Sequence, residues 1–94
     1  MKESWVYILE CRDGSYYTGC TTNIQQRLAQ HETGVCDGYT AKRLPVKLVW
    51  TTHFSDLRDA IATERRLKKW SRKKKAALIR GDIDALRRYA KKTF

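Results

Sequence analysis

The chain has 94 residues, a hydrophobic content of 41% and a formal net charge of +10. A chain of this length forms one small domain with a modest core and leaves no room for a second one. So large a positive charge on so small a body is typical of a protein that binds a polyanion, and nucleic acid is the first candidate.

The N-terminus and the cysteines indicate the compartment. No apolar run reaches the roughly 18 residues needed to span a bilayer, and residues 1–4 lead directly into a strand pattern instead of a signal peptide. The cysteines, Cys11, Cys20 and Cys36, are odd in number and lack the spacing of structural zinc ligands, which favours reduced thiols. We therefore expect a soluble, cytoplasmic protein that does not associate with membranes.

The first two strands are joined by a turn at Arg12-Asp13-Gly14. A three-residue turn with Gly14 in the left-handed conformation pairs Tyr7 with Gly19. Because side chains alternate along a strand, Tyr7 and Tyr17 then lie on the same face of the sheet. A two-residue turn would place them on opposite faces, so the register decides whether the two phenols can share a site.

The segment after the hairpin follows helical spacing up to His31 or Glu32. Thr22 and Gln25 are placed to form a capping box that closes its first turn. Arg27 lies four residues before His31, so both side chains share a face that borders the buried stripe. We therefore predict a helix that presents a cation beside an imidazole.

The second half of the chain begins with a loop at residues 34–38, and Pro45 marks the entry to a strand over residues 46–54. Three helices follow, and their predicted N-caps are Ser55, Ser71 and Asp82. Gly81 ends the second of these helices. The inner face of the last helix is predicted to carry Ile83, Leu86 and Ala90.

Glu64 lies within the apolar stripe of the first of these three helices, between Ile61 and Leu67. A carboxylate that faces a core is costly unless it is paired, hydrogen-bonded or bound to a metal. A salt bridge to a nearby base, a side chain that reaches sideways to water and a role as a ligand are therefore the open alternatives.

A block of basic residues without any acidic residue begins at Arg65. Its members are Arg65, Arg66, Lys68, Lys69, Arg72, Lys73, Lys74 and Lys75. Basic helix faces are often only solvated surface, but the lack of acids favours contact with phosphates. Trp70 interrupts the block and either stacks on a base or anchors the helix junction in the core.

Taken together, the motifs resemble those of the GIY-YIG endonuclease domain. They are Val6-Tyr7-Ile8, Tyr17-Thr18-Gly19, Asn23-Ile24 with Arg27-Leu28 and His31, Gly38-Tyr39-Thr40, Pro45-Val46-Lys47-Leu48-Val49 and Glu64-Arg65-Arg66-Leu67-Lys68. The resemblance covers residues 5 to about 80 and is closest to small stand-alone bacterial proteins described as predicted endonucleases. It implies an α+β fold with a three-stranded antiparallel sheet flanked by helices. We expect a single domain over residues 1–94, with its core at about 5–80 and a basic C-terminal helix at 82–92.

The resemblance also implies a nuclease site. Tyr7 would act as the general base or position the attacking water, with Tyr17 beside it. Arg27 would bind the scissile phosphate, and His31 would occupy a position where relatives have a histidine or a tyrosine. Glu64 would hold a single divalent ion, Mg²⁺ or Mn²⁺. We expect these five side chains to converge on one concave, partly exposed surface.

The expected contacts with nucleic acid come from basic residues outside this site. They are Lys42, Arg43, Arg65, Lys68, Lys69, Arg72, Lys73, Lys74 and Lys75. One departure from the excision-repair relatives is Cys20, which follows the second motif where those proteins have a lysine. That part of the phosphate clamp is missing here or is supplied by Lys42, Arg43 or the run at residues 73–75.

The function predicted from these features is that of a divalent-metal-dependent endonuclease that hydrolyses DNA phosphodiester bonds in DNA repair or processing. Branched or single-stranded DNA is among the expected substrates, and the protein is expected to be a monomer that a protein partner can target. The alternatives are a non-catalytic nucleic-acid-binding module and an accessory subunit of a repair assembly.

Overall fold

The computed structural model describes residues 2–35 and 38–91, and within these the strands form one antiparallel sheet with the order β2-β1-β3. The strands are β1 (Ser4–Glu10), β2 (Tyr16–Thr21) and β3 (Lys47–Phe54). The helices are α1 (Ile24–Glu32), α2 (Gly38–Ala41), α3 (Leu57–Lys68), α4 (Arg72–Arg80) and α5 (Ile83–Lys91). The predicted α+β class with a three-stranded antiparallel sheet is thereby confirmed.

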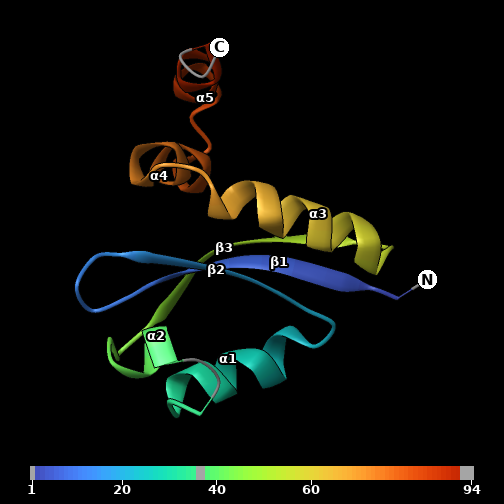
Figure 1. Ribbon diagram of the computed structural model, residues 1–94, viewed down its shortest axis with the longest axis vertical. Coiled ribbons are helices and arrows are strands. Elements are labelled where there is room, and N and C mark those ends of the chain that lie inside the picture. Colours follow the sequence, from blue (N-terminus) through green and yellow to red (C-terminus); the bar gives the residue numbers. More distant parts are fainter. Residues whose placement is uncertain (1, 36–37, 92–94) are drawn as a thin grey trace.

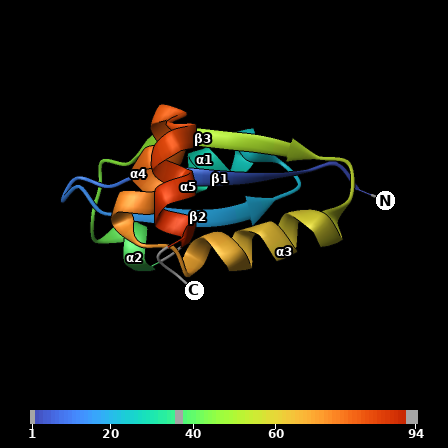
Figure 2. The same cartoon turned by 90° about the horizontal axis from the view of Figure 1, so that it is seen from above.

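The helices cover both faces of the sheet. Figure 1 shows α1 and α2 on one face, α3 and α4 on the other, and α5 beyond α4. Seen from above, α3 runs along the β2 side of the sheet (Figure 2). Because β2 is an edge strand, helices on both faces can bring side chains to the same edge. None of the helices in the described ranges is long and apolar enough to cross a membrane.

The register of the hairpin confirms the prediction from its turn. Tyr7 pairs with Gly19, and Leu9 pairs with Tyr17. Gly14 has a φ of 83°, in the left-handed region that glycine adopts without strain. The two tyrosines therefore lie on the same face of the sheet, which is the face covered by α1 and α2.

The opposite face carries an apolar core. Val6 of β1 is fully buried against Ala60 and Leu67 of α3. Trp50 and Trp70 pack against this cluster, so Trp70 anchors the junction between α3 and α4, as one of the two alternatives predicted. Burial of apolar area at about 25 cal/mol per Å² is what holds α3 to the sheet.

Two predicted helix caps are wrong by one residue. The N-cap of α1 is Asn23 and not Thr22, and the side chain of Asn23 accepts a hydrogen bond from the backbone N–H of Gln26 at 3.1 Å. Asparagine caps helices better than threonine does, which explains the shift. The N-cap of α3 is Asp56 and not Ser55, because a carboxylate is the stronger acceptor for the N-terminal N–H groups of a helix.

The caps of the last two helices match the prediction, but the inner face of the last helix does not. Ser71 and Gly81 cap α4 as predicted, with Gly81 at a φ of 72°, and Asp82 accepts a hydrogen bond from the backbone N–H of Ala85. The expected inner position of Ile83 is wrong, because its side chain is 56% exposed and Ala85 is buried in its place. The side chain of Ala90 and residue 92 lie outside the described residues.

The segment between α1 and β3 also differs from the prediction. It contains the short helix α2, of which Gly38 is the first residue, where only a loop ending at Gly38 was expected. Residues 36–37 of that loop lie outside the described residues. The third strand begins at Lys47, one residue later than predicted. Helix α2 matters for function because it brings Tyr39 and Thr40 to the face of the sheet that carries the paired tyrosines.

Candidate active site

A chain of buried hydrogen bonds connects β1 to α1 and α2. Tyr7 Oη lies 2.8 Å from His31 Nε2, and His31 Nδ1 lies 2.9 Å from Thr40 Oγ1. All three side chains are fully buried. A neutral imidazole has one donor and one acceptor nitrogen, so this chain satisfies both nitrogens of His31 in either tautomer. The chain therefore fixes the position of the Tyr7 phenol.

Tyr17 stands in front of this buried chain and is half-buried. Its ring centroid lies 6.5 Å from that of Tyr7 and 5.1 Å from that of His31. The ring of Tyr39 also stacks on it, at 6.1 Å and 30°. Tyr17 is therefore the phenol of the pair that lies closer to solvent, and its ring contacts those of Tyr7, His31 and Tyr39.

Arg43 holds Tyr39 in this cluster. Its guanidinium carbon lies 3.8 Å above the centre of the Tyr39 ring, and its Nη1 donates to the Tyr39 carbonyl at 3.0 Å. Its Nε donates to Asp13 Oδ2 at 3.1 Å. Hydrogen bonds from the Ser15 hydroxyl and backbone N–H, with a smaller contribution from Arg43, lower the pKa of Asp13. Arg43, which the sequence predicted to contact nucleic acid, is therefore engaged within the protein.

The charges of Arg27 and Glu64 both act on Cys20 of the edge strand β2. Burial raises the pKa of the Cys20 thiol, the negative charge of Glu64 raises it further, and the positive charge of Arg27 opposes both effects. Both charges thus act on Cys20, one from α1 and the other from α3. The two helices that cover opposite faces of the sheet therefore each carry a predicted site residue whose charge acts on the β2 strand.

The surroundings of Glu64 distinguish between the alternatives for its role. Its Oε1 lies 3.7 Å from Lys68 Nζ, and the side chains are 20% and 51% exposed, respectively. This distance is longer than a hydrogen bond, and such a pair near the surface contributes about 0 to 1 kcal/mol. Glu64 is therefore a partly exposed carboxylate with a loose partner, and it is not fixed in a buried ion pair.

The residues present fit a metal site with a single protein carboxylate. The described residues contain no group of three or more His, Cys, Asp or Glu side chains that could enclose a metal ion. Magnesium usually binds through one or two carboxylates, with water and substrate phosphate as its other ligands. Glu64 meets this requirement, so it is the residue that would hold such an ion.

Tyr7, Tyr17 and His31 cluster between the sheet and α1, and the charges of Arg27 and Glu64 both act on Cys20 of β2. The expectation that all five share a partly exposed surface is wrong for Tyr7 and His31, which are fully buried by their mutual hydrogen bond and by the packing of α1 and α2.

Sequence reasoning missed two residues of this cluster. Thr40 ends the buried hydrogen-bond chain, and Tyr39 packs on Tyr17. Both belong to the Gly38-Tyr39-Thr40 motif, which was recognised by sequence but given no role. The signal was present, but only the fold of α2 shows what these side chains contact.

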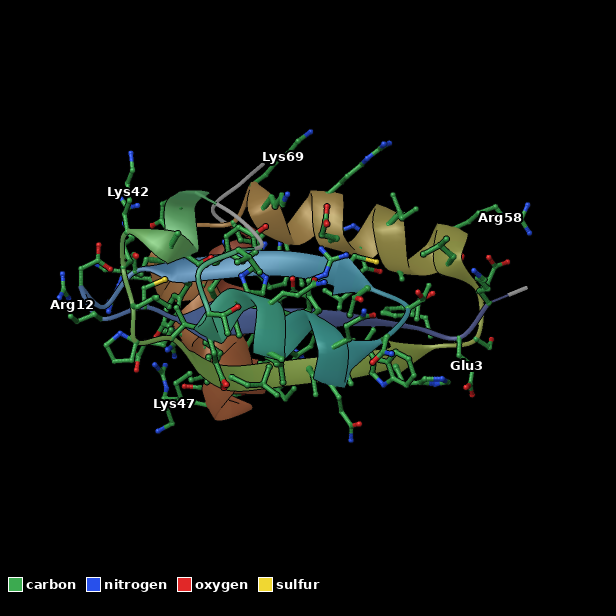
Figure 3. All side chains as sticks on the ribbon, turned by 90° about the horizontal axis from the view of Figure 1, so that it is seen from below. Glu3, Arg12, Lys42, Lys47, Arg58 and Lys69 are labelled. Atoms are coloured by element: carbon green, nitrogen blue, oxygen red, sulfur yellow. The ribbon has the colours of Figure 1, made fainter. Side chains whose placement is uncertain are left out.

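The basic block is divided between surface and interior. Residues 65, 66, 68, 69, 72 and 73 are exposed, whereas Lys75 is only 9% exposed. Lys42 and Lys69 both project on the β2 side of the molecule, and Lys47 projects on the β3 side (Figure 3). Two of the exposed cations, Lys42 and Lys69, therefore lie on the side of the molecule that carries the edge strand β2.

The fold and the site together define a small α+β domain with paired tyrosines and a helix-borne carboxylate at one sheet edge. Residues 3–77 match the family described as the GIY-YIG catalytic domain. The chain therefore belongs to the GIY-YIG family of nuclease domains, which confirms the resemblance noted in its motifs.

Several similar proteins carry the name UPF0213. The one from Streptococcus pneumoniae serotype 4 is 42% identical over 82 residues, which are 87% of this chain and 83% of that protein. The one from Halobacterium salinarum is 47% identical over 74 residues, which are 79% of this chain and 96% of that protein. These names state no activity.

Two solution NMR structures are also similar to this chain. The UPF0213 protein from Bacillus halodurans has 41% identity and a TM-score of 0.57, with 85% of each chain covered. A protein from E. faecalis has 35% identity and a TM-score of 0.59, with 86% of each chain covered. Both support the fold described above.

Proposed function

We propose that this protein is a divalent-metal-dependent endonuclease that hydrolyses phosphodiester bonds in DNA. One observation carries the proposal: the half-buried phenol of Tyr17 packs against the buried hydrogen-bond chain of Tyr7 and His31, and the charges of Arg27 and Glu64 both act on Cys20 of the same strand. A phenol, a phosphate-binding cation and a metal-binding carboxylate are the parts that such a hydrolysis requires. Membership of the GIY-YIG family supports the same activity.

The two tyrosines take different roles in this proposal. Tyr17 contacts the attacking water, because it is the phenol closer to solvent. Tyr7 is a positioning residue, since its hydroxyl is buried and bonded to His31. A free phenol ionises only near pH 10, so a nearby cation is needed to make it an effective base at neutral pH. The charge of Arg27, or of the metal ion, supplies this condition.

Arg27 and Glu64 act on the phosphate. The planar guanidinium of Arg27 can donate two hydrogen bonds to phosphate oxygens and stabilise the charge that develops in the transition state. Glu64 holds the divalent ion, Mg²⁺ or Mn²⁺. When bound, this ion polarises the phosphate and stabilises the leaving oxygen.

The exposed cations supply the affinity for DNA. Lys42, Lys69 and Lys73 are exposed and contact the phosphate backbone in this proposal. Contacts of this kind position a strand but do not read its sequence. We therefore propose a monomeric protein that acts in DNA processing, including repair, and is directed by DNA structure or by a protein partner.

Cleavage assays test the proposal. Supercoiled, single-stranded and branched DNA are incubated with Mg²⁺ or Mn²⁺ and with wild-type protein, Glu64→Gln or Glu32→Gln. Glu32→Gln is the matched control, because it removes the same charge from an exposed position on α1. We expect the wild type and Glu32→Gln to cut, and Glu64→Gln to be at least 100-fold slower. No cleavage by the wild type, or equal rates for both variants, would overturn the proposal.

A non-catalytic nucleic-acid-binding module is the second candidate. It is favoured by Cys20, which follows the second motif where the excision-repair relatives have a lysine. Such a module needs only the basic surface. Tight DNA binding without any cleavage in the same assays would support this function in place of the first.

A further inference from the structure

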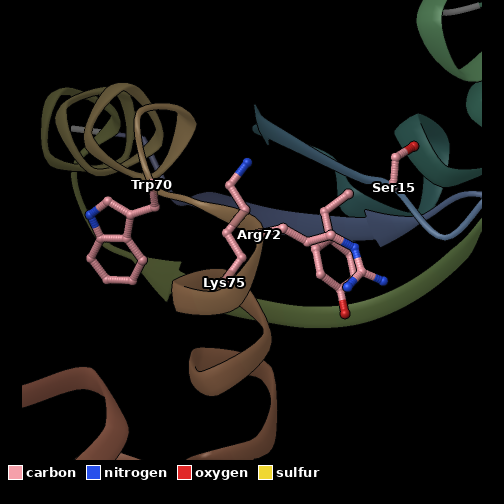
Figure 4. A pocket seen from close by; sticks show the side chains of 5 residues that line it. Ser15, Trp70, Arg72 and Lys75 are labelled. Carbon is pink, nitrogen blue, oxygen red and sulfur yellow. The ribbon is translucent and has the colours of Figure 1, made fainter. Parts of the chain in front are cut away.

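A pocket of about 230 Å³ lies at the junction of the hairpin, α3 and α4. It is lined by Ser15, Tyr16, Trp70, Arg72 and Lys75 (Figure 4). Tyr16 is the neighbour of Tyr17 on β2, and successive side chains of a strand point to opposite faces. The pocket is therefore separate from the candidate active site, but it lies on the same edge strand.

Lys75 brings an unusual charge to this pocket. Its side chain is only 9% exposed and extends from α4 into the space between Trp70 and Arg72 (Figure 4). Among the described residues, its ammonium group has no hydrogen-bond or ion-pair partner. Burial, and to a smaller degree the positive charge of Lys68, lower the pKa of Lys75. The ammonium nitrogen is not among the fully buried side-chain atoms, so it is accessible from the pocket, where an anionic ligand would pair with it.

Arg72 is a second cation that is already held in place. Its Nε and Nη2 donate to the carbonyl oxygen of Gly14 at 3.1 and 2.9 Å. Its guanidinium carbon lies 5.1 Å from the centre of the Tyr16 ring. A guanidinium fixed before the ligand arrives loses little entropy when it binds an anion.

The pocket wall also carries two aromatic rings, those of Tyr16 and Trp70. Lys74 Nζ lies 4.2 Å from the centre of the Trp70 ring and so adds a further positive charge nearby. A ligand that is both planar and anionic matches aromatic rings next to cations, and a nucleotide has both properties. The volume is below the roughly 300 to 1,000 Å³ of sites for drug-sized ligands, which suits a single base and not a base pair.

We propose that this pocket binds one unpaired nucleotide of the DNA strand, with the base against Tyr16 or Trp70 and the phosphate at Arg72 and Lys75. This inference rests on the proposed function, since the bound strand continues around β2 towards Tyr17. Bases in a duplex are paired and stacked and cannot enter. The pocket therefore selects single-stranded ends, flaps or branched DNA over intact duplex.

Binding assays without metal test the inference. The probes are a 5′-phosphorylated thymidine tetranucleotide and a blunt duplex, and the variants are Lys75→Met and Lys73→Met. Both variants lose one charge from α4, but Lys73 is exposed and does not line the pocket. We expect Lys75→Met to weaken tetranucleotide binding at least tenfold and Lys73→Met at most about threefold. On duplex binding the order is reversed, because Lys73 is a proposed contact of the phosphate backbone and Lys75 lies in a pocket that the duplex does not enter. Equal losses of tetranucleotide binding in the two variants would overturn the inference.

A second variant and a second readout guard against indirect effects. Tyr16→Leu removes a ring and no charge, and we expect it to weaken the tetranucleotide at least threefold and to leave duplex binding unchanged. In NMR titrations of the wild type with the tetranucleotide, the largest amide shifts should lie at residues 14–16 and 70–75. Shifts confined to residues 38–40 would contradict the inference.

The two proposals can fail separately. If the wild type binds the tetranucleotide in this pocket but cuts no DNA, the nuclease proposal fails and the pocket stands. If the wild type cuts DNA but Lys75→Met binds the tetranucleotide as Lys73→Met does, only the pocket is refuted.

Discussion

The ring of Tyr7 lies directly against the α-carbon of Gly19 on the neighbouring strand. A β-carbon built on Gly19 would overlap Oη and Cζ of Tyr7. Gly19 does not have a positive φ, so its backbone conformation is open to any residue. Glycine is therefore required here for space, and this space lets the Tyr7 hydroxyl reach His31.

Gly19→Ala should destabilise the protein. The added methyl group displaces the Tyr7 ring and breaks its hydrogen bond to His31, at a cost of about 2 to 5 kcal/mol for overpacking and unsatisfied groups together. The free energy of unfolding in urea measures this loss. Gly38→Ala is the control, because among the described residues no atom outside the neighbouring backbone lies within 4 Å of the β-carbon it adds. Equal stability of both variants would contradict the packing described for Tyr7.

Tyr7→Phe and Tyr17→Phe should have different effects. Tyr7→Phe leaves a buried nitrogen of His31 without its partner and should lower the free energy of unfolding by about 1 to 3 kcal/mol. Tyr17→Phe keeps the ring contacts with His31 and Tyr39, so we expect a smaller loss of stability and a loss of cleavage. Urea unfolding and DNA cleavage are measured on both variants. Full cleavage by Tyr17→Phe would remove this tyrosine from the proposed chemistry.

Glu64→Gln should change the stability by less than about 1 kcal/mol, because the pair with Lys68 is loose and exposed to solvent. Thermal and urea unfolding of the variant test this expectation independently of any activity. A loss of about 3 to 5 kcal/mol would instead mean that Glu64 compensates a buried charge. Such a result would weaken its assignment as the metal ligand.

The stability of the protein should depend on pH through Lys75, whose pKa is lowered from its ordinary value of 10.5 by burial and by Lys68. Between the lowered pKa and 10.5, the unfolded chain binds more protons than the folded one, so stability rises with pH in this window. Below the window, the folded state carries the full cost of the buried charge. We therefore expect Lys75→Met to be more stable than the wild type at pH 7, with a difference that shrinks towards pH 10.5.

Urea unfolding at several pH values measures this difference. Tyr16 and Arg72, which line the same pocket, are unchanged in the three proteins compared: the wild type, Lys75→Met and Lys73→Met. Lys73→Met serves as the control for the loss of an exposed charge from α4. A gap between Lys75→Met and the wild type that is the same at all pH values would contradict the assignment to Lys75.

DNA affinity should fall steeply with added salt, and the exposed cations on the β2 side should set the slope. Replacing both Lys42 and Lys69 with alanine should reduce the slope of log affinity against log salt by roughly 2, because each lost phosphate contact contributes about 0.9. Lys47→Ala is the control, because Lys47 projects on the β3 side (Figure 3). Equal effects of Lys47→Ala and of a single β2-side replacement would argue against a localised binding surface.

The features that the sequence predicts correctly depend on local interactions. The three-residue turn sets the register that brings Tyr7 and Tyr17 to one face, because turn length and strand alternation leave one solution. Ser71 and Gly81 bound α4 for similarly local reasons. Even local predictions fail where two adjacent residues compete for one role, as Ser55 and Asp56 do at the start of α3.

The tertiary structure alone decided how deeply each functional side chain lies and what it contacts. Tyr7 and His31 are buried because α2, distant in sequence from β1, closes over them and supplies Thr40. In the sequence, Lys75 is not distinguished from the other cations of the basic block. The packing of α4 against the hairpin places it in the wall of a pocket. Burial and pairing depend on contacts between segments far apart in the chain, and periodicity along one segment carries no information about them.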